Sequence, residues 1–231
     1  MTVLSKEFFD DRWERGNIPI KLRGVRLKDY APVPNPRTGE PHKSGIIAHM
    51  EAQAFVNEFS DHFISAKRAA NGNLPANRHN IGKGLMFHGH NGTRKTTLAV
   101  SILTEIQHLN YGYFGFYIRF SDWKRSLTDT FAKEETERTL LAKKYLKLAE
   151  LSPLLVLDDI GQEHRTSSGF TESSLHELLR VRYESARPTI VTTNIDPEFM
   201  REIYGASFDS FRHDAFTTLE MLGRDSRLIK D

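Results

Sequence analysis

The segment from Gly89 to Thr97 has the residue types and the spacing of a loop that binds phosphate. Counted from Gly89, it reads Gly-x-x-x-x-Arg-Lys-Thr, so only the glycine before the lysine is missing from the nucleotide-loop pattern, and Arg94 stands there. An apolar run at 85–88 precedes the loop, and residues 95–109 show helical periodicity. Backbone N–H groups at a helix N-terminus attract anions, so the sequence predicts a phosphate site here.

Three side chains at the end of the loop have expected roles in binding ATP. Lys95 is expected to neutralise the β- and γ-phosphates, and the Thr96 hydroxyl is expected to ligate Mg²⁺. Arg94 puts a long cation where glycine is usual, so the loop is expected either to be strained or to gain a phosphate contact. The expected nucleotide contacts are Gly89, His90, Asn91, Gly92, Thr93, Arg94, Lys95, Thr96 and Thr97.

Two later apolar runs each deliver polar side chains to a strand end. The first ends in Asp158, expected to hold the Mg²⁺ shell, and Asp159, placed to polarise the attacking water. Aspartate is a methylene shorter than the glutamate often found there, so hydrolysis of ATP to ADP and phosphate is expected either to be slow or to need a partner that adjusts the geometry. The second run, from Arg187, ends in Asn194, whose amide is expected to orient water against the γ-phosphate.

These segments resemble the DnaC/DnaI-type helicase loaders of the AAA+ superfamily. The resemblance is carried by residues 154–163, 178–184 and 187–194, with support from 16–23 and 121–131, and it extends over roughly residues 16–227. The hydrophobic pattern places strands at about 85–89, 113–120, 154–159, 189–193 and 216–222. The expected fold is therefore α/β, an AAA+ P-loop ATPase core with a five-stranded parallel sheet, flanking helices and no C-terminal lid domain.

The chain is expected to divide into two regions. Residues 1–45 are read as an N-terminal helix and an extended, proline-rich segment, and residues 46–231 as the ATPase core, which opens with a helix over 46–70. In the N-terminal helix, expected over 4–15, the residues Phe8, Phe9 and Trp13 cluster on one face. That face either grips a partner protein or covers the core of the chain itself.

The resemblance implies that several copies assemble as a spiral or ring that grips a DnaB-type hexameric helicase and single-stranded DNA. Without a lid, a neighbouring subunit would complete the nucleotide site. Arg212 best matches the arginine supplied in this way, with Arg224 and Arg227 as weaker candidates. Two alternatives stay open: an IstB-type transposition helper ATPase on duplex DNA, and a pseudo-ATPase adaptor that binds the helicase without turnover, which Arg94 favours.

A predicted helix between the second and third strands combines cations with aromatic rings. Lys124 and Arg125 are expected to contact DNA phosphates, and Phe131 is expected to stack on a base. Phe131 matches a DNA-contacting aromatic of the loaders, and Phe170 is a second candidate. Trp123, by contrast, is expected to lie in the core.

Composition limits the class of protein. There are no cysteines, so disulfides and thiolate metal sites are excluded, and the net charge is only +2. There is neither a run of 18 apolar residues nor a signal peptide, so a cytoplasmic protein with no membrane contact is expected. The chain length of 231 residues and the resemblance favour an origin in a phage or mobile element.

Overall fold

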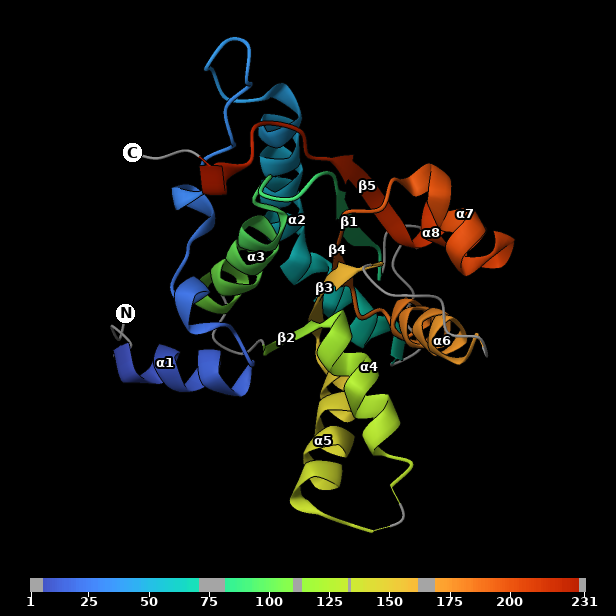
Figure 1. Cartoon of the computed structure of the whole chain (residues 1–231). Coiled ribbons are helices and arrows are strands. Elements are labelled where there is room, and N and C mark those ends of the chain that lie inside the picture. The colour runs from blue at the N-terminus through green and yellow to red at the C-terminus, as the bar shows by residue number, and fades with distance from the viewer. Residues whose placement is uncertain (1–5, 71–81, 110–113, 133, 162–168, 229–231) are drawn as a thin grey trace.

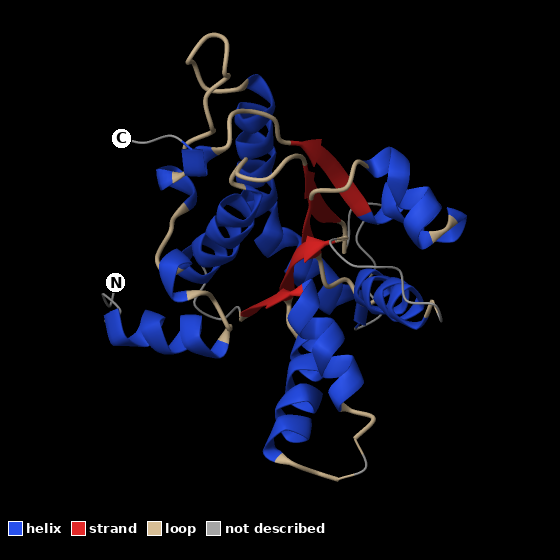
Figure 2. Cartoon of the chain, in the orientation of Figure 1, coloured by secondary structure: helices blue, strands red, loops and turns tan. Residues whose placement is uncertain are grey.

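The computed structural model describes residues 6–70, 82–109, 114–132, 134–161 and 169–228. In these residues, five parallel strands form one sheet in the order β2-β3-β4-β1-β5. Figure 2 shows the strands at the centre of the molecule with helices on both sides. The predicted five-stranded parallel sheet is confirmed. The strands are β1 (Gly84–His88), β2 (Gly115–Arg119), β3 (Leu154–Ile160), β4 (Thr189–Thr193) and β5 (Phe216–Glu220).

The helices cover the two faces of the sheet as separate groups (Figure 1). The helices on one face are α1 (Lys6–Arg15), α2 (Lys43–Ala70) and α3 (Lys95–Leu109). Those on the other are α4 (Phe120–Asp129), α5 (Glu137–Leu151), α6 (Phe170–Glu184), α7 (Pro197–Tyr204) and α8 (Ala206–Ala215). Side chains alternate along each strand, so Leu154 and Val156 of β3 join the core under α3, whereas Leu155 and Leu157 join the opposite core. Three short 3-10 helices complete the described chain, namely η1 (Ile20–Leu22), η2 (Leu27–Asp29) and η4 (Ser226–Leu228).

The N-terminal helix packs on the chain's own core. The Phe9 ring stacks on His108 of α3 with 4.1 Å between ring centroids, and Trp13 is buried in the same cluster. This aromatic face was expected either to grip a partner protein or to cover the core of the chain. In the structure, Phe9 and Trp13 pack on the core. Residues 4 and 5 of the expected helix lie outside the described residues.

Several expected element bounds differ from the structure. Helix α2 begins at Lys43, three residues before the expected start, and the Ser44 N–H donates to His42 Nδ1 at its first turn. The expected division after residue 45 therefore falls inside a helix. Strand β2 ends at Arg119 because Phe120 already begins α4, and residue 113 of the expected strand is not among those described. Strand β5 ends at Glu220, two residues early, whereas the helix predicted over 95–109 is confirmed.

In the part of the chain that the structure describes, no helix combines the length and the apolar character that crossing a membrane requires.

Candidate functional site

The loop between β1 and α3 is built from left-handed backbone conformations. Gly89, Gly92 and Arg94 have φ values of 140°, 76° and 63°. A side chain at Gly89 would meet the Met221 carbonyl oxygen at 2.1 Å, so only glycine fits there. Arg94 is the exception, because it holds a φ that costs a residue with a Cβ atom about 1–2 kcal/mol. The backbone thus has the glycine-type geometry of a phosphate loop even where the residue is arginine.

Lys95, the first residue of α3, turns its side chain back into the loop. Its Nζ donates to the carbonyl oxygens of Gly89 and His90, both at 2.7 Å, and lies 3.4 Å from Thr93 Oγ1. The residue is only 8% exposed. Burial lowers the pKa of Lys95, while Asp159 and Asp158 act to raise it. The ammonium group is therefore placed at the centre of the loop, next to two carboxylates.

The Asp158 carboxylate is held by three hydroxyl groups from three different elements. Thr96 Oγ1 and Thr192 Oγ1 donate to Asp158 Oδ1 at 2.7 and 2.6 Å, and the Tyr117 hydroxyl donates to Oδ2 at 2.8 Å. Asp158 is 5% exposed, and burial raises the pKa of Tyr117. The predicted pair of Mg²⁺ ligands, Thr96 and Asp158, is thus brought into direct contact. A hydroxyl beside a buried carboxylate is a donor set of the kind that Mg²⁺ accepts.

Asp159 sits on a β-bulge at the end of β3. The β3–β4 register shifts between Leu157 and Ile160, and Asp159 has a φ of 64°. Its backbone N–H donates to Thr192 Oγ1 at 2.9 Å. Burial and the neighbouring Asp158 raise the pKa of Asp159, while Lys95 and Arg227 lower it. The bulge therefore leaves a second, partly desolvated carboxylate beside the first.

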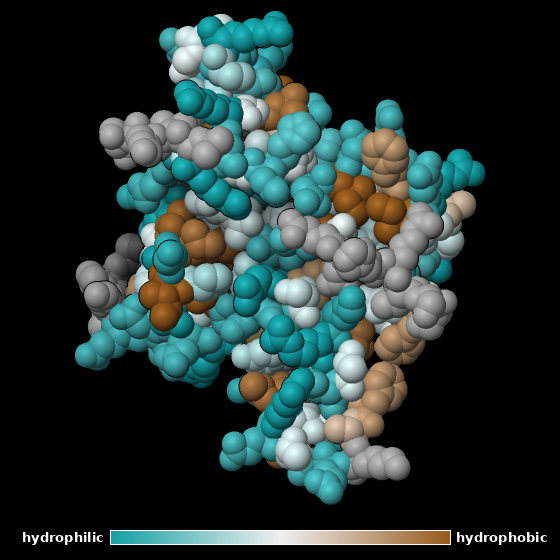
Figure 3. All heavy atoms as spheres, in the orientation of Figure 1, coloured by the Kyte–Doolittle hydropathy of each residue, from teal (hydrophilic) through white to brown (hydrophobic). Residues whose placement is uncertain are grey.

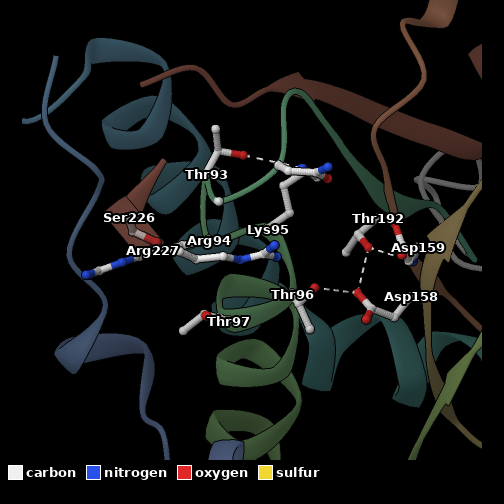
Figure 4. Close-up of a pocket in the computed structure, with 12 residues that line it drawn as sticks. Thr93, Arg94, Lys95, Thr96, Thr97, Asp158, Asp159, Thr192, Ser226 and Arg227 are labelled. Atoms are coloured by element: carbon white, nitrogen blue, oxygen red, sulfur yellow. Dashed lines mark hydrogen bonds between the residues drawn. The ribbon is translucent and has the colours of Figure 1, made fainter. Parts of the chain in front are cut away.

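These side chains surround one pocket of about 520 Å³ (Figure 4). Its lining includes seven of the nine expected nucleotide contacts, from Asn91 to Thr97, together with Asp158 and Asp159. Gly89 and His90 are not in the lining and contribute carbonyl oxygens to Lys95 instead. A pocket with a cation, a hydroxyl and two carboxylates at a helix N-terminus can bind a nucleotide phosphate with its metal ion.

The lining also contains three residues that the sequence analysis did not assign to it, namely Thr192, Ser226 and Arg227. Thr192 lies within β4, whereas Asn194 comes just after the strand has ended. No local signal in the sequence marks Thr192 rather than its neighbour Thr193. Arg227 is expected from the sequence only as a weaker candidate for a neighbouring subunit's site, but it lines the pocket of its own chain. It lies there because the Ser226 N–H donates to the Gly92 carbonyl oxygen, which holds this segment against the phosphate loop.

Asn194 and Arg212, both expected at the catalytic centre, are not among the lining residues. Asn194 follows β4, and the polar side chain of this strand that reaches Asp158 is that of Thr192. Arg212 lies in α8 and is buried, and its Nη2 is 2.9 Å from Asp209 Oδ1. A position outside its own pocket is compatible with action on a neighbouring subunit, but the guanidinium group would first have to leave Asp209.

The expected DNA contacts lie on the other side of the sheet. Phe131 is 69% exposed just after α4, Phe170 is 44% exposed at the start of α6, and their rings contact each other at 5.6 Å. Arg125 is exposed on α4, with Asp122 3.5 Å away, and Lys124 is half-buried on the same helix. Trp123 is buried and stacks on Phe120, which confirms its predicted place in the core.

The Arg94 side chain leaves the loop in the direction of the N-terminal connector. Its Nη1 donates to the Ala31 carbonyl oxygen at 3.1 Å, and the residue is exposed. We expect Arg94→Gly to tighten ATP binding severalfold, because glycine adopts a φ of 63° without strain and lets phosphate approach the backbone. Isothermal titration calorimetry measures the change.

Arg94→Ala is the matched control for that variant, since it removes the guanidinium group but keeps the Cβ atom. Binding should improve for glycine and not for alanine. Equal or weaker ATP affinity of Arg94→Gly would mean that Arg94 is itself a phosphate ligand.

The phosphate loop after β1, with β1 between β4 and β5, defines an α/β P-loop fold. No protein-family model matches the chain. Over 122 residues, or 52% of this chain, it is 28% identical to the replicative helicase loader DnaI of Bacillus subtilis (strain 168), and the match spans 36% of that protein.

Solved structures give the same fold. The crystal structure of the DnaC helicase loader matches with a TM-score of 0.65 and 23% identity, covering 88% of this chain and 100% of that chain. AMPPCP-bound DnaA from Aquifex aeolicus matches with a TM-score of 0.56 and 14% identity, covering 88% and 52%. The chain therefore has the AAA+ fold of the DnaC and DnaI helicase loaders and resembles DnaI in sequence.

Proposed function

We propose that the chain is an ATP-controlled helicase loader. It binds a DnaB-type hexameric replicative helicase together with single-stranded DNA and delivers the helicase to an origin or fork. The observation that carries the proposal is the convergence of Lys95, Thr96 and Asp158 in one pocket, on a fold shared with a DnaC loader. Phage or mobile-element origin and action in the cytoplasm belong to the same proposal.

ATP and Mg²⁺ are the proposed cofactors. Lys95 would neutralise the β- and γ-phosphates, and Thr96 and Asp158 would hold the metal ion. Asp159 would orient and polarise the attacking water, and its raised pKa suits a carboxyl that exchanges a proton. Bound nucleotide would hold several copies in a spiral or ring, in which Arg212 reaches a neighbouring pocket. Hydrolysis would then release the helicase.

The test of this function is assembly with a purified DnaB-type hexamer on circular single-stranded DNA, followed by sedimentation. We expect the chain and the helicase to sediment together with ATP and Mg²⁺, and Lys95→Ala to abolish the effect of ATP. Co-sedimentation that is identical with and without ATP would instead support the pseudo-ATPase adaptor. The arginine that replaces the usual glycine of the phosphate loop is the observation that favours this second candidate.

Exposed aromatic rings support single-stranded DNA as the nucleic-acid partner. On the face shown in Figure 3 the surface is mainly hydrophilic, and hydrophobic side chains form separate patches rather than one continuous area. The contact between Phe131 and Phe170 places two exposed rings side by side, and Arg125 is exposed on α4, the helix that Phe131 follows. Rings for stacking beside cations for phosphates are the usual means of binding single strands without sequence preference.

Phe131→Ala is expected to weaken binding of single-stranded DNA about tenfold at fixed salt. Base stacking on an aromatic ring is worth about 1–3 kcal/mol per base, and Phe131 has the more exposed ring of the pair. Fluorescence anisotropy of a labelled oligonucleotide, with an ATP analogue present, measures the loss.

Phe199→Ala is the matched control, because Phe199 is also an exposed phenylalanine but lies on α7. Phe199→Ala should change the affinity for single-stranded DNA by less than about twofold. Tight binding to duplex DNA that Phe131→Ala leaves unchanged would contradict the loader and favour the IstB-type helper.

A further inference from the structure

The Asp158 carboxylate is fixed by donors that reach it from both neighbouring strands. Strand β3 lies between β2 and β4, and each neighbour contributes one hydroxyl, from Tyr117 to Oδ2 and from Thr192 to Oδ1. The third donor, Thr96, is the residue expected to bind the metal ion itself. Tyr117 and Thr192 are therefore the two donors to Asp158 that come from strands of the sheet.

Tyr117 reaches Asp158 because of the strand register. Arg119 pairs with Asp158, and Tyr117 lies two residues earlier on β2, so its side chain leaves the sheet on the same face as that of Asp158. Tyr117 is buried, and its ring belongs to the core under α3. The phenol hydroxyl is consequently a fixed donor rather than a mobile surface group.

The backbone of Tyr117 is fixed from the outer side as well. Strand β2 is at the edge of the sheet, and the segment that follows α1 runs along it. The Tyr117 N–H donates to the Gly16 carbonyl oxygen at 2.8 Å, and Asn17 Nδ2 donates to the Tyr117 carbonyl oxygen at 3.0 Å. Tyr117 is thus held between the N-terminal segment and the candidate metal ligand.

We propose that Tyr117 is a positioning residue that orients the Asp158 carboxylate for Mg²⁺, an inference that rests on the proposed Mg²⁺-nucleotide function. A carboxylate that is already oriented by hydrogen bonds binds a metal ion more tightly than one that must first be ordered. Phenylalanine at this position would leave Asp158 Oδ2 without its buried donor. The metal-dependent part of nucleotide binding then falls, while direct contacts between the loop and the phosphates are kept.

The test compares AMPPCP affinity in excess Mg²⁺ with affinity in EDTA, measured by calorimetry on the full chain. For Tyr117→Phe we expect the gain in affinity from Mg²⁺ to fall about tenfold, the usual size of an effect on outer hydrogen bonds of a metal ligand. Affinity in EDTA should stay within twofold of the unmodified chain. Tyr145→Phe removes a hydroxyl from α5, away from the pocket, and should change neither value.

A double-mutant cycle with Asp158→Asn shows whether Tyr117 acts through Asp158. We expect Tyr117→Phe to have no further effect on the Mg²⁺ gain once Asp158 is replaced. Three outcomes would each overturn the inference about Tyr117 but not the proposed function. The losses of the two variants could be additive, Tyr117→Phe could weaken AMPPCP binding equally in Mg²⁺ and in EDTA, or it could leave the gain in affinity from Mg²⁺ unchanged. An unmodified chain that binds AMPPCP without any Mg²⁺ gain would overturn the proposed function and this inference together.

Discussion

Arg182→Met is expected to lower the free energy of unfolding by about 3–5 kcal/mol, the cost of breaking a buried charged network. Arg182 is fully buried on α6, and burial lowers its pKa to about 9. Its guanidinium group donates to five acceptors at 2.8–2.9 Å: the carbonyl oxygens of Ala149, Glu150, Ser152 and Pro188, and Thr189 Oγ1. Three of these carbonyls lie at the C-terminus of α5, where a cation also complements the helix dipole.

Methionine would fill much of the space but leave three buried carbonyl oxygens and the partly buried one of Glu150 without that donor. Urea unfolding followed by circular dichroism measures the loss. The matched control is Arg180→Met on the same helix, where the exposed ion pair with Glu184 is expected to contribute less than about 1 kcal/mol. The loss of stability in Arg182→Lys should lie between those of the two methionine variants, because lysine keeps the charge but loses the planar guanidinium group. A loss below about 1 kcal/mol for Arg182→Met would show that the carbonyls find other donors.

Lys95→Ala and Arg212→Ala are each expected to reduce ATP turnover at least a hundredfold, and a mixture of the two variants is expected to recover part of it. An arginine supplied to the transition state of phosphoryl transfer is worth about 10³–10⁵ in rate. A mixed interface can pair an intact Lys95 pocket with an intact Arg212 from the neighbouring copy. Phosphate release by each variant alone and by the mixture, at the same total concentration, measures the recovery.

Asp209→Asn separates this role from a structural one. Arg212 is buried and contacts Asp209, Thr218 and His213, and Asp209→Asn removes the charge of the ion pair while it keeps the arginine and an amide acceptor. Turnover that survives Asp209→Asn but not Arg212→Ala would support action on a neighbouring pocket. Full turnover of assembled Arg212→Ala would instead show that the arginine assignment is wrong.

Much of the fold could be predicted because local patterns and global packing agree. The β1 strand and α3 could be predicted from a short apolar run and from helical spacing of apolar residues, and both elements are largely buried. The ends of helices and strands were less predictable where one element continues directly into the next. Phe120, for example, fits an apolar strand pattern but begins α4, and its ring stacks on Trp123 in the core.

The sequence by itself indicated the phosphate loop and the acidic pair of the candidate site. The spacing of Gly89, Lys95 and Thr96 and the adjacent acids after a buried run require only that a strand, a loop and a helix follow one another. Only the tertiary structure decided which residues support those groups. Tyr117 and Thr192 reach Asp158 through the order and register of three strands, 41 and 34 residues apart in the chain. Arg227 reaches the pocket because the segment after β5 returns to the phosphate loop. Such contacts depend on which segments become neighbours in space, and no local pattern records that.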